Sequence, residues 1–219
     1  MRIDMWTDMG CPWCYIGKAR LHQAIELAGL ADKVELVLHS FELDANATLT
    51  PEPIAQMLAK KFGESTENIL AMEVRVSDLA AAEGLPFSHQ RLHANTFNVH
   101  RIMHLAANYG VGTEVFEAVQ NEYFAGSSNP YIDETLIRIG GSFGIPLEEI
   151  QEVLASDRFT EEVRSDEAHA RELGITGVPF TVFTRSYALP GAANVAQYLE
   201  VIKMAREEAA FAESEAPVD

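Results

Sequence analysis

Cysteine is scarce in this chain of 219 residues, which has only two, Cys11 and Cys14. Two cysteines cannot build a disulfide framework, and they cannot supply the four thiolates of a zinc site made of cysteines alone. They either act as one pair or have no chemical role. Long apolar runs are also missing, because no stretch approaches the roughly 18–20 residues that a membrane-spanning helix needs.

Basic residues are few as well, with 16 Lys and Arg against 33 Asp and Glu, which gives a net charge of −17. Phosphate groups would be repelled by such a chain, so nucleic acid and anionic membranes are not expected as partners. The first residues lack the charged-then-apolar layout of a signal peptide. We therefore expect a cytoplasmic protein with an ordinary globular composition, 47% apolar and 22% charged.

The beginning of the chain predicts a strand, a helix and a second strand. Residues 2–7 resemble a short strand, and a helical pattern runs from Pro12 to a stop at Gly29. Residues 34–41 carry apolar side chains on both faces, which is typical of an interior strand. Because no hairpin turn separates the two strands, we expect a parallel crossover unit.

The middle of the chain predicts helices and no convincing strand. Strand signals return at 179–183 and 187–189, and Asn194 can cap a last helix. The predicted fold is therefore α/β, with one sheet domain formed by residues 1–48 and 172–219 and an inserted all-helical domain formed by residues 49–171. The helices predicted in this insertion lie at about 51–62, 66–83, 95–109, 113–124, 132–140, 147–155 and 158–173.

The pair Cys11-Pro12-Trp13-Cys14 stands at the start of the first predicted helix. Unpaired backbone N–H groups and the positive end of the helix dipole favour an anion there, so Cys11 is the expected thiolate nucleophile. Cys14 lies one turn further on, where it can displace a substrate bound to Cys11 as a mixed disulfide. The same spacing also fits half of a metal site or two small buried residues. The position after an N-terminal strand favours the redox interpretation.

A second motif, Gly177-Val178-Pro179, precedes the late predicted strand. Together with the cysteine pair it resembles the thioredoxin superfamily, and the long helical insertion resembles the DsbA family. The segments 95–101 and 187–192 are similar to the FrnE-type branch of cytoplasmic oxidoreductases. The resemblance implies a thioredoxin fold in which the helical domain is inserted after the first strand-helix-strand unit.

In that family the proline that matches Pro179 is cis and packs against the redox pair. The resemblance thus implies a substrate-binding role for Gly177, Val178 and Pro179, with the Val178 backbone free to pair with an extended peptide. Pro12 and Trp13 would tune the pair. Trp13 replaces the histidine of periplasmic DsbA and offers no cation, so we expect a less oxidising pair. Residues 125–131 also depart from the charged stretch usual in FrnE-type members.

Four histidines form two i, i+4 pairs, His89 with His93 and His100 with His104. On a helix each pair would share one face, as metal ligands do. A turn-like segment around Pro86 speaks against a helix at 89, and His100 falls inside the family-like segment. We therefore expect no metal.

The sequence predicts a thiol–disulfide oxidoreductase that oxidises, reduces or isomerises disulfides of protein or small-molecule substrates. It predicts no tightly bound cofactor, with glutathione or thioredoxin as the redox partner, and a monomer or homodimer. One alternative is a glutathione-dependent enzyme, either a kappa-class transferase or a 2-hydroxychromene-2-carboxylate isomerase. Those enzymes resemble this fold but typically carry serine where Cys11 stands. A non-catalytic binding module or holdase is the other alternative.

Overall fold

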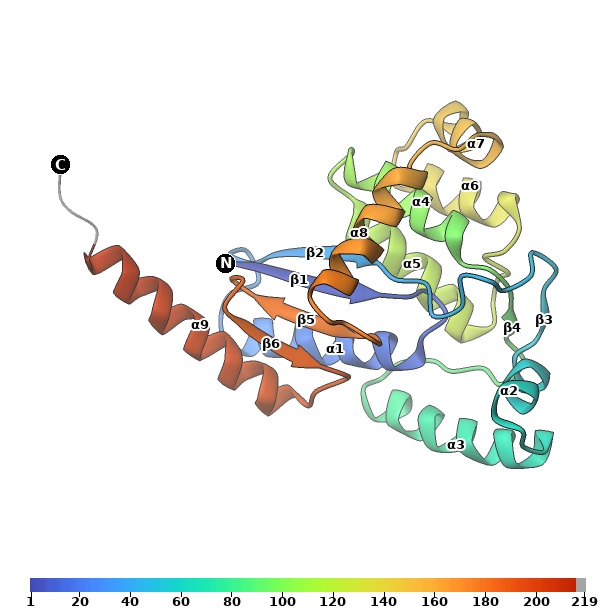
Figure 1. Cartoon of the computed structure of the whole chain (residues 1–219), viewed down its shortest axis with the longest axis horizontal. Coiled ribbons are helices and arrows are strands. Elements are labelled where there is room, and N and C mark those ends of the chain that lie inside the picture. The colour runs from blue at the N-terminus through green and yellow to red at the C-terminus, as the bar shows by residue number, and fades with distance from the viewer. Residues whose placement is uncertain (216–219) are drawn as a thin grey trace.

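A four-stranded sheet forms the centre of the computed structural model, which describes the backbone of residues 1–215 and the side chains of residues 1–208. Its strands lie in the order β2-β1-β5-β6 (Figure 1). β1 pairs in parallel with β2 and antiparallel with β5, and β5 pairs antiparallel with β6. These strands are β1 (Arg2–Thr7), β2 (Glu35–Ser40), β5 (Phe180–Phe183) and β6 (Tyr187–Pro190).

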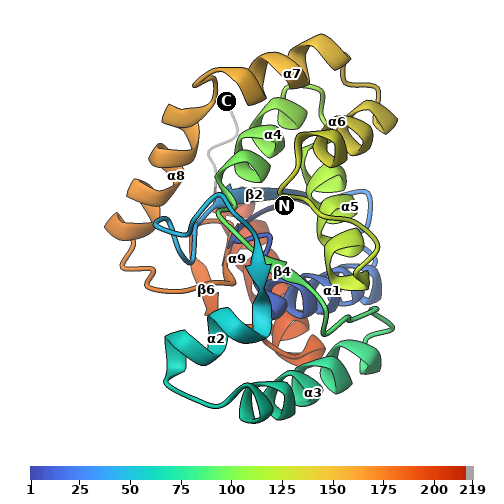
Figure 2. The same cartoon turned by 90° about the vertical axis from the view of Figure 1, so that its right-hand side faces the viewer.

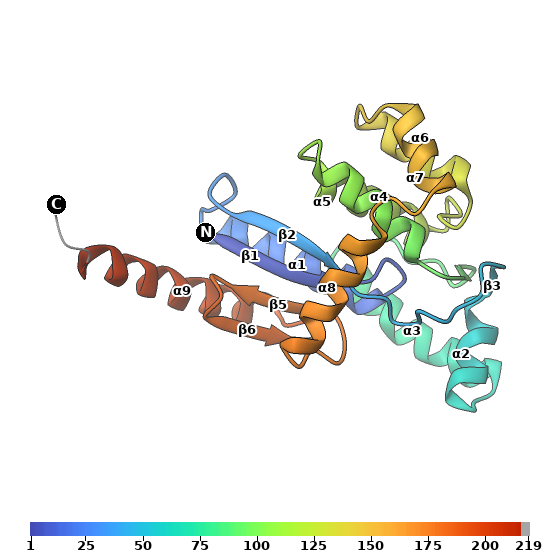
Figure 3. The same cartoon turned by 45° about the horizontal axis from the view of Figure 1, so that its top comes forward.

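The alternation of side chains along β1 divides the molecule into layers. Met5 points into the core that α1 (Pro12–Leu27) and α9 (Val195–Glu215) share on one face of the sheet. Trp6 points to the opposite face, where its indole N–H donates to a backbone oxygen of α8 (Thr160–Glu172). Figures 1 and 3 show α8 crossing this second face of the sheet. The arrangement confirms the predicted α/β class and the predicted parallel pairing of the first two strands.

One prediction about the sheet was wrong, because β2 is an edge strand and not an interior one. Its apolar side chains on both faces have another cause. α8 packs against β2, and so does α5 (Gly112–Ala125). Helices therefore bury an edge strand in the way that neighbouring strands bury an interior one.

Helices fill the chain between β2 and β5, as predicted. Figure 2 shows α2 and α3 together on one side of the short strand β4, with α4, α6 and α7 on the other side. The division of the chain at 48/49 and 171/172 remains a prediction, and residues 216–219 of the predicted sheet domain lie outside the described residues. The remaining helices are α2 (Ile54–Phe62), α3 (Thr66–Ala82), α4 (Phe97–Ala107), α6 (Asp133–Ser142) and α7 (Leu147–Ala155).

The expectation of a strand-free middle segment was wrong in one place. β3 (Glu52–Pro53) and β4 (Leu92–His93) pair antiparallel as a two-residue ribbon. Proline is tolerated in an edge strand where its missing N–H would face away from the partner strand, so Pro53, the last residue of β3, is compatible with this pairing. Strands of two residues are too short to leave a periodic signal in the sequence.

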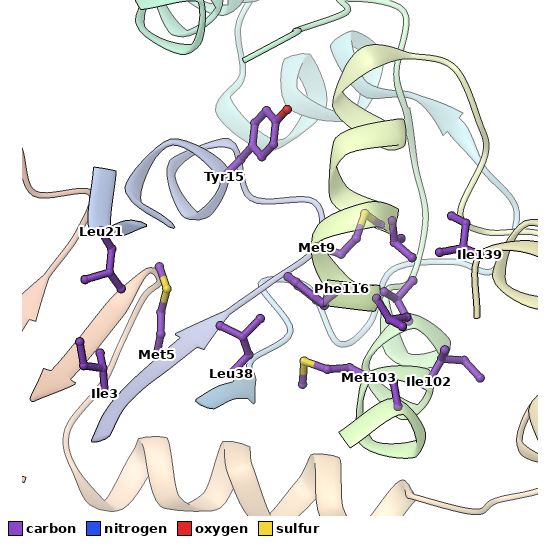
Figure 4. Packing of buried hydrophobic residues seen from close by; sticks show 14 of the residues in the cluster. Ile3, Met5, Met9, Tyr15, Leu21, Leu38, Ile102, Met103, Phe116 and Ile139 are labelled. Carbon is purple, nitrogen blue, oxygen red and sulfur yellow. The ribbon is translucent and has the colours of Figure 1, made fainter. Parts of the chain in front are cut away.

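One apolar core joins the sheet to the helices α4 to α7. Figure 4 shows Met5 and Leu38 of the sheet, Met9 beyond the end of β1, and Met103 and Phe116 of the helices. All of them are buried in the same cluster. The turn that follows β1 is therefore held by packing from the helical segment. None of the helices within residues 1–215 is long and apolar enough to cross a membrane.

Candidate redox site

Cys11 occupies the N-cap position of α1, and Pro12 is the first helical residue. The backbone is extended at Cys11, with φ −83° and ψ 112°, so its side chain turns back over the first turn of the helix. The backbone N–H of Cys14 donates to Cys11 Sγ at 3.3 Å. A sulfur in this place takes the role that a serine or aspartate oxygen has in an ordinary N-cap. Negative charge on Cys11 is therefore favoured by a hydrogen bond and by the helix dipole.

Cys14 lies in the first turn of α1 and is the more deeply buried of the two cysteines. It is completely buried, whereas Cys11 is 2% exposed, and both are free thiols. Burial raises the pKa of Cys14 well above its ordinary value, and the neighbouring Cys11 raises it further through a hydrogen bond and its charge. The two sulfurs are thus unequal. The Cys11 sulfur accepts a hydrogen bond at the helix N-terminus, whereas the Cys14 sulfur is buried with a raised pKa.

The loop before β5 closes over the cysteines. Cys11 Sγ lies 3.6 Å from the carbonyl oxygen of Val178, to which the thiol donates, and the Val178–Pro179 peptide bond is cis, as predicted. Val178 is half-buried and Pro179 is buried, whereas Gly177 is exposed. The structure therefore brings Val178 to the sulfur and places Gly177 at the outer end of the loop.

Gly17 determines how closely this loop approaches α1. A Cβ atom at Gly17 would lie 3.2 Å from Pro179 Cγ and 3.2 Å from the Cα of Ala192. Both distances are tighter than ordinary contacts, and one of the two atoms belongs to the backbone. Gly17 could not be predicted from the sequence, because nothing local distinguishes it from other helical glycines.

A cavity of about 620 Å³ opens beside Cys11. Cys11, Val178 and the 42%-exposed Trp13 lie at one end, and α2 and α3 supply a largely apolar wall. This volume is in the range of small-molecule and peptide side-chain sites. The lining side chains of α2 and α3 are Ile54, Met57, Leu58, Lys61, Phe62, Ile69, Met72, Glu73, Arg75, Val76 and Leu79.

Asp8 organises the turn between β1 and Cys11, a role that no sequence motif predicts. Its carboxylate accepts from Leu43 N at 2.8 Å and from Gly10 N at 3.3 Å, and His100 Nε2 lies 3.6 Å away. Burial opposes the charge on Asp8, but His100 and the Leu43 N–H lower its pKa overall. Gln120 of α5 donates to the carbonyl oxygens of both Asp8 and Met9. The helical segment thus holds the turn that presents Cys11.

The four histidines do not converge. His100 and His104 lie on α4 as predicted, but His104 faces Asp166, at 3.2 Å, while His100 faces Asp8. His89 and His93 are not helical, since His93 belongs to β4. Within the described part of the chain, no group of three or more His, Cys, Asp or Glu side chains could hold a metal ion.

Several solved structures are similar to this chain over most of its length. A probable DsbA oxidoreductase from Streptomyces coelicolor, SCO1869, is 36% identical, with a TM-score of 0.90 over 100% of this chain and 93% of its own. The cytosolic disulfide reductase DsbM from Pseudomonas aeruginosa is 16% identical, with a TM-score of 0.61 over 98% of each chain. A 2-hydroxychromene-2-carboxylate isomerase is 17% identical, with a TM-score of 0.64 over 100% of each chain.

The two more distant similarities concern the fold alone, because the same fold hosts different chemistries. The sequence profile of the DSBA-like thioredoxin domain matches residues 2–203, which spans β1, the whole helical segment and part of α9. A match of this extent includes both motifs of the site, the cysteine pair and the loop at Val178. The chain is therefore a member of the DSBA-like thioredoxin domain family.

Proposed function

We propose that this protein is a thiol–disulfide oxidoreductase in which Cys11 attacks the substrate and Cys14 resolves the mixed disulfide. The observation that carries the proposal is the inequality of the two sulfurs. Cys11 Sγ accepts the Cys14 N–H at the start of α1, whereas the pKa of the buried Cys14 is raised. A dithiol needs one reactive thiolate and one reserve thiol, and the unequal positions of the two sulfurs support this division of roles.

The reaction has two exchange steps. The Cys11 thiolate attacks one sulfur of a substrate disulfide, forms a Cys11–substrate disulfide and releases the other substrate sulfur as a thiolate. The Cys14 thiolate then attacks Cys11 Sγ, which forms the Cys11–Cys14 disulfide and releases the second substrate thiolate. The substrate gains two electrons and the protein loses two. Run in reverse, the same steps oxidise a substrate dithiol.

We propose that protein disulfides and small thiols or disulfides enter through the cavity beside Cys11. Its apolar wall on α2 and α3 fits apolar side chains that flank a substrate cysteine. The Val178 carbonyl, 3.6 Å from Cys11 Sγ, lies where an extended peptide could pair with the loop. Trp13 at the mouth supplies no positive charge, which favours a less oxidising pair than one with histidine there.

We also propose that the enzyme works in the cytoplasm, holds no cofactor tightly, and is recharged by glutathione or thioredoxin. The cytosolic reductase DsbM, whose fold is similar, is consistent with this location. A FrnE-type identity within the family and an isomerase activity are part of the same proposal. The isomerase activity requires the dithiol form of the Cys11–Cys14 pair to be accessible to substrate.

The test uses the two cysteine variants separately. Cys11→Ser should abolish insulin reduction, because no nucleophile remains at the helix N-terminus. Cys14→Ser should still attack but should fail to resolve, so it accumulates as a mixed disulfide with substrate. This adduct appears as a higher band on a non-reducing gel and disappears with dithiothreitol. If Cys11→Ser keeps full activity, or if Cys14→Ser traps nothing, the proposed function is wrong.

The alternative is a glutathione-dependent isomerase or transferase, which the similar fold of the 2-hydroxychromene-2-carboxylate isomerase brings into consideration. Such an enzyme needs only one group at position 11, to hold the thiolate of glutathione. Full turnover of a glutathione conjugate by Cys14→Ser, without trapped substrate, would favour this alternative.

A further inference from the structure

The second exchange step poses a chemical problem. Cys14 must lose its proton before it can attack Cys11 Sγ, yet Cys14 is completely buried. A thiolate without a compensating charge is costly in such a place. The cation nearest to it along α1 is Lys18, whose side chain is only 6% exposed. We propose that the Lys18 ammonium, one helical turn from Cys14, stabilises the Cys14 thiolate during resolution, an inference that rests on the proposed function.

The geometry of α1 directs Lys18 toward Cys14. Residues four apart lie on the same face of a helix, and helical side chains lean toward the N-terminus. Lys18 therefore starts from the same face of α1 as Cys14, and the two groups are close enough for the charge of Cys14 to act on Lys18. Both residues are among the buried positions of α1.

The Lys18 ammonium is poorly paired for a buried cation. Nζ lies 3.6 Å from Glu117 Oε1 and 5.3 Å from the centre of the Phe116 ring. It has no hydrogen-bond partner among the described residues. Buried lysines are usually paired, and breaking or omitting a partner costs stability. An ammonium held in this way is available to an anion that forms only during the reaction.

Other charged or titratable groups face the same region. Glu117 of α5 lies between Lys18 and His22, whose Nε2 is 2.7 Å from the same carboxylate oxygen. Tyr198 of α9 is buried close enough to Cys14 for the charge of Cys14 to raise its pKa, in addition to the larger effect of burial. Toward α3, Arg20 pairs with Glu83 at 2.6 Å, so that those two charges compensate each other.

The charge state of Lys18 fits this role. Burial lowers its pKa to about 8, while Glu117 and Cys14 act in the opposite direction. The ammonium is therefore the main form at neutral pH. In the resolving step Cys14 gives its proton to water, the resulting thiolate attacks Cys11 Sγ, and the released substrate thiolate takes up a proton. Lys18 keeps its own proton throughout, and its charge lowers the cost of the intermediate thiolate.

The test separates the two exchange steps in the full chain. Reduced protein is mixed with dithiobis(nitrobenzoate), an aromatic disulfide whose released thiolate is coloured. The first release reports attack by Cys11 and depends on reagent concentration. The second release is unimolecular, because it reports displacement by Cys14. The rate of each phase is measured as a function of pH for the wild type and for Lys18→Met, Lys18→Gln and Lys18→Arg.

We expect Lys18→Met and Lys18→Gln to move the pH midpoint of the second phase upward by roughly one unit or more. At pH values below the midpoint, the second phase should therefore be slower by about tenfold or more. The first phase should change little. Lys18→Arg keeps the charge, so its second phase should stay close to that of the wild type. A merely structural role of Lys18 would change both phases or the unfolding temperature, but it would not move the midpoint of one phase alone.

Failure of the Lys18 inference and failure of the proposed function give different results. If wild-type protein shows both phases and the neutral variants keep the wild-type second midpoint, Lys18 has no such role and the proposed function stands. If wild-type protein never releases the second coloured thiolate, the proposed function itself fails. The titration of Cys14 by its ultraviolet thiolate absorbance, in Cys11→Ser with and without Lys18→Gln, gives an independent measurement. An unchanged Cys14 pKa there would also overturn the inference.

Discussion

The helix pair α2–α3, which lines the cavity, and the helix pair α4–α5, which does not, differ sharply in how they are held. Seven residues of α4 and six of α5 are buried, but only one of α2 and three of α3. The α2–α3 pair instead leaves large apolar side chains more than one-third exposed, namely Phe62, Leu70, Met72, Val74 and Leu79. The α4–α5 pair is part of the core, whereas the α2–α3 pair is only attached to it.

The attachment of α2–α3 depends on a few polar links. Glu73 of α3 pairs with Arg91, whose guanidinium lies 4.1 Å from the centre of the Phe87 ring. Glu83, just after α3, accepts from Arg20 and Gln23 of α1. Segments with little buried apolar surface open more easily than core elements do. The cavity therefore has one rigid side next to Asp8 and one side that can adapt to different substrates.

The largest loss of stability should come from a substitution in the core that contains α4–α5. Phe124→Ala removes a fully buried ring that stacks on Tyr15 at 4.5 Å and on Phe87 at 5.4 Å. We expect a loss of about 3–5 kcal/mol in the free energy of unfolding, measured by urea denaturation. Phe62→Ala on α2, where the ring is 55% exposed, is the matched control and should cost less than about 0.5 kcal/mol. Equal losses would contradict the contrast between the two pairs.

Glu73→Gln should detach α3 without unfolding the core. The side chains of Arg91 and Glu73 are only 1% and 8% exposed, so the variant leaves a buried guanidinium without its counter-charge. We expect a loss of about 3 kcal/mol and faster hydrogen exchange in α3 than in α5. The exposed pair Lys60–Glu52 provides the control, since Lys60→Met should cost less than about 1 kcal/mol. Uniformly faster exchange in α3 and α5 would show that the two pairs unfold together.

The attachment of α8 to the sheet should depend on pH. Burial alone would lower the pKa of His39, but hydrogen bonds to Asp166 and Asp4, both 2.8 Å, raise it to about 9. The folded pKa exceeds the ordinary 6.5, so this contribution is complete below about pH 6.5 and is lost as pH rises through 9.

The contribution of the Asp4 carboxylate to stability has the opposite dependence on pH. The pKa of Asp4 is lowered from 3.8 to about 2, because its hydrogen bonds to His39 and Arg2 outweigh the effect of burial. That contribution is therefore lost as pH falls through about 2. We expect the wild type to lose on the order of 2 kcal/mol between pH 6.5 and pH 9, and His39→Gln to show a flatter profile. Parallel pH profiles for the two proteins would refute this assignment.

The smallest change in stability should accompany a change in substrate use. Met72 lines the cavity and is 48% exposed, whereas Leu70 on the same helix is 41% exposed and does not line it. Met72→Ala should lower kcat/KM for reduction of a protein disulfide about threefold to tenfold. Leu70→Ala should not. Both variants should keep the unfolding free energy within about 0.5 kcal/mol of the wild type.

Local patterns in the sequence predict most of the fold. The predicted helix at 147–155 has the observed bounds of α7, and the strand at 2–7 has those of β1. Apolar periodicity and capping residues act within a few neighbours, so they can be read from one sequence. The edge position of β2 could not be predicted, because it depends on α5 and α8 arriving from far along the chain.

The same limit applies to the site. The cysteine pair and Val178-Pro179 are visible as motifs, and the structure brings them together. Gln120, Gly17 and Lys18 carry no motif. Their importance comes from what lies opposite them: the Asp8 and Met9 carbonyls, the Pro179 loop and the Glu117 carboxylate. Long-range complementarity of this kind has no signature in the spacing of residues.

The order of strands in the sheet has a consequence during synthesis on the ribosome. β1 pairs with β5, and Cys11 Sγ contacts the Val178 carbonyl. Val178 lies 167 residues after Cys11 in the chain. At about 5–20 residues per second, that distance corresponds to roughly 10–30 s of translation. During this interval the nascent chain carries both thiols without the loop that shields them. A newly made molecule is therefore most exposed to unwanted oxidation before it has become an enzyme, and the arrival of β5 both builds the site and protects it.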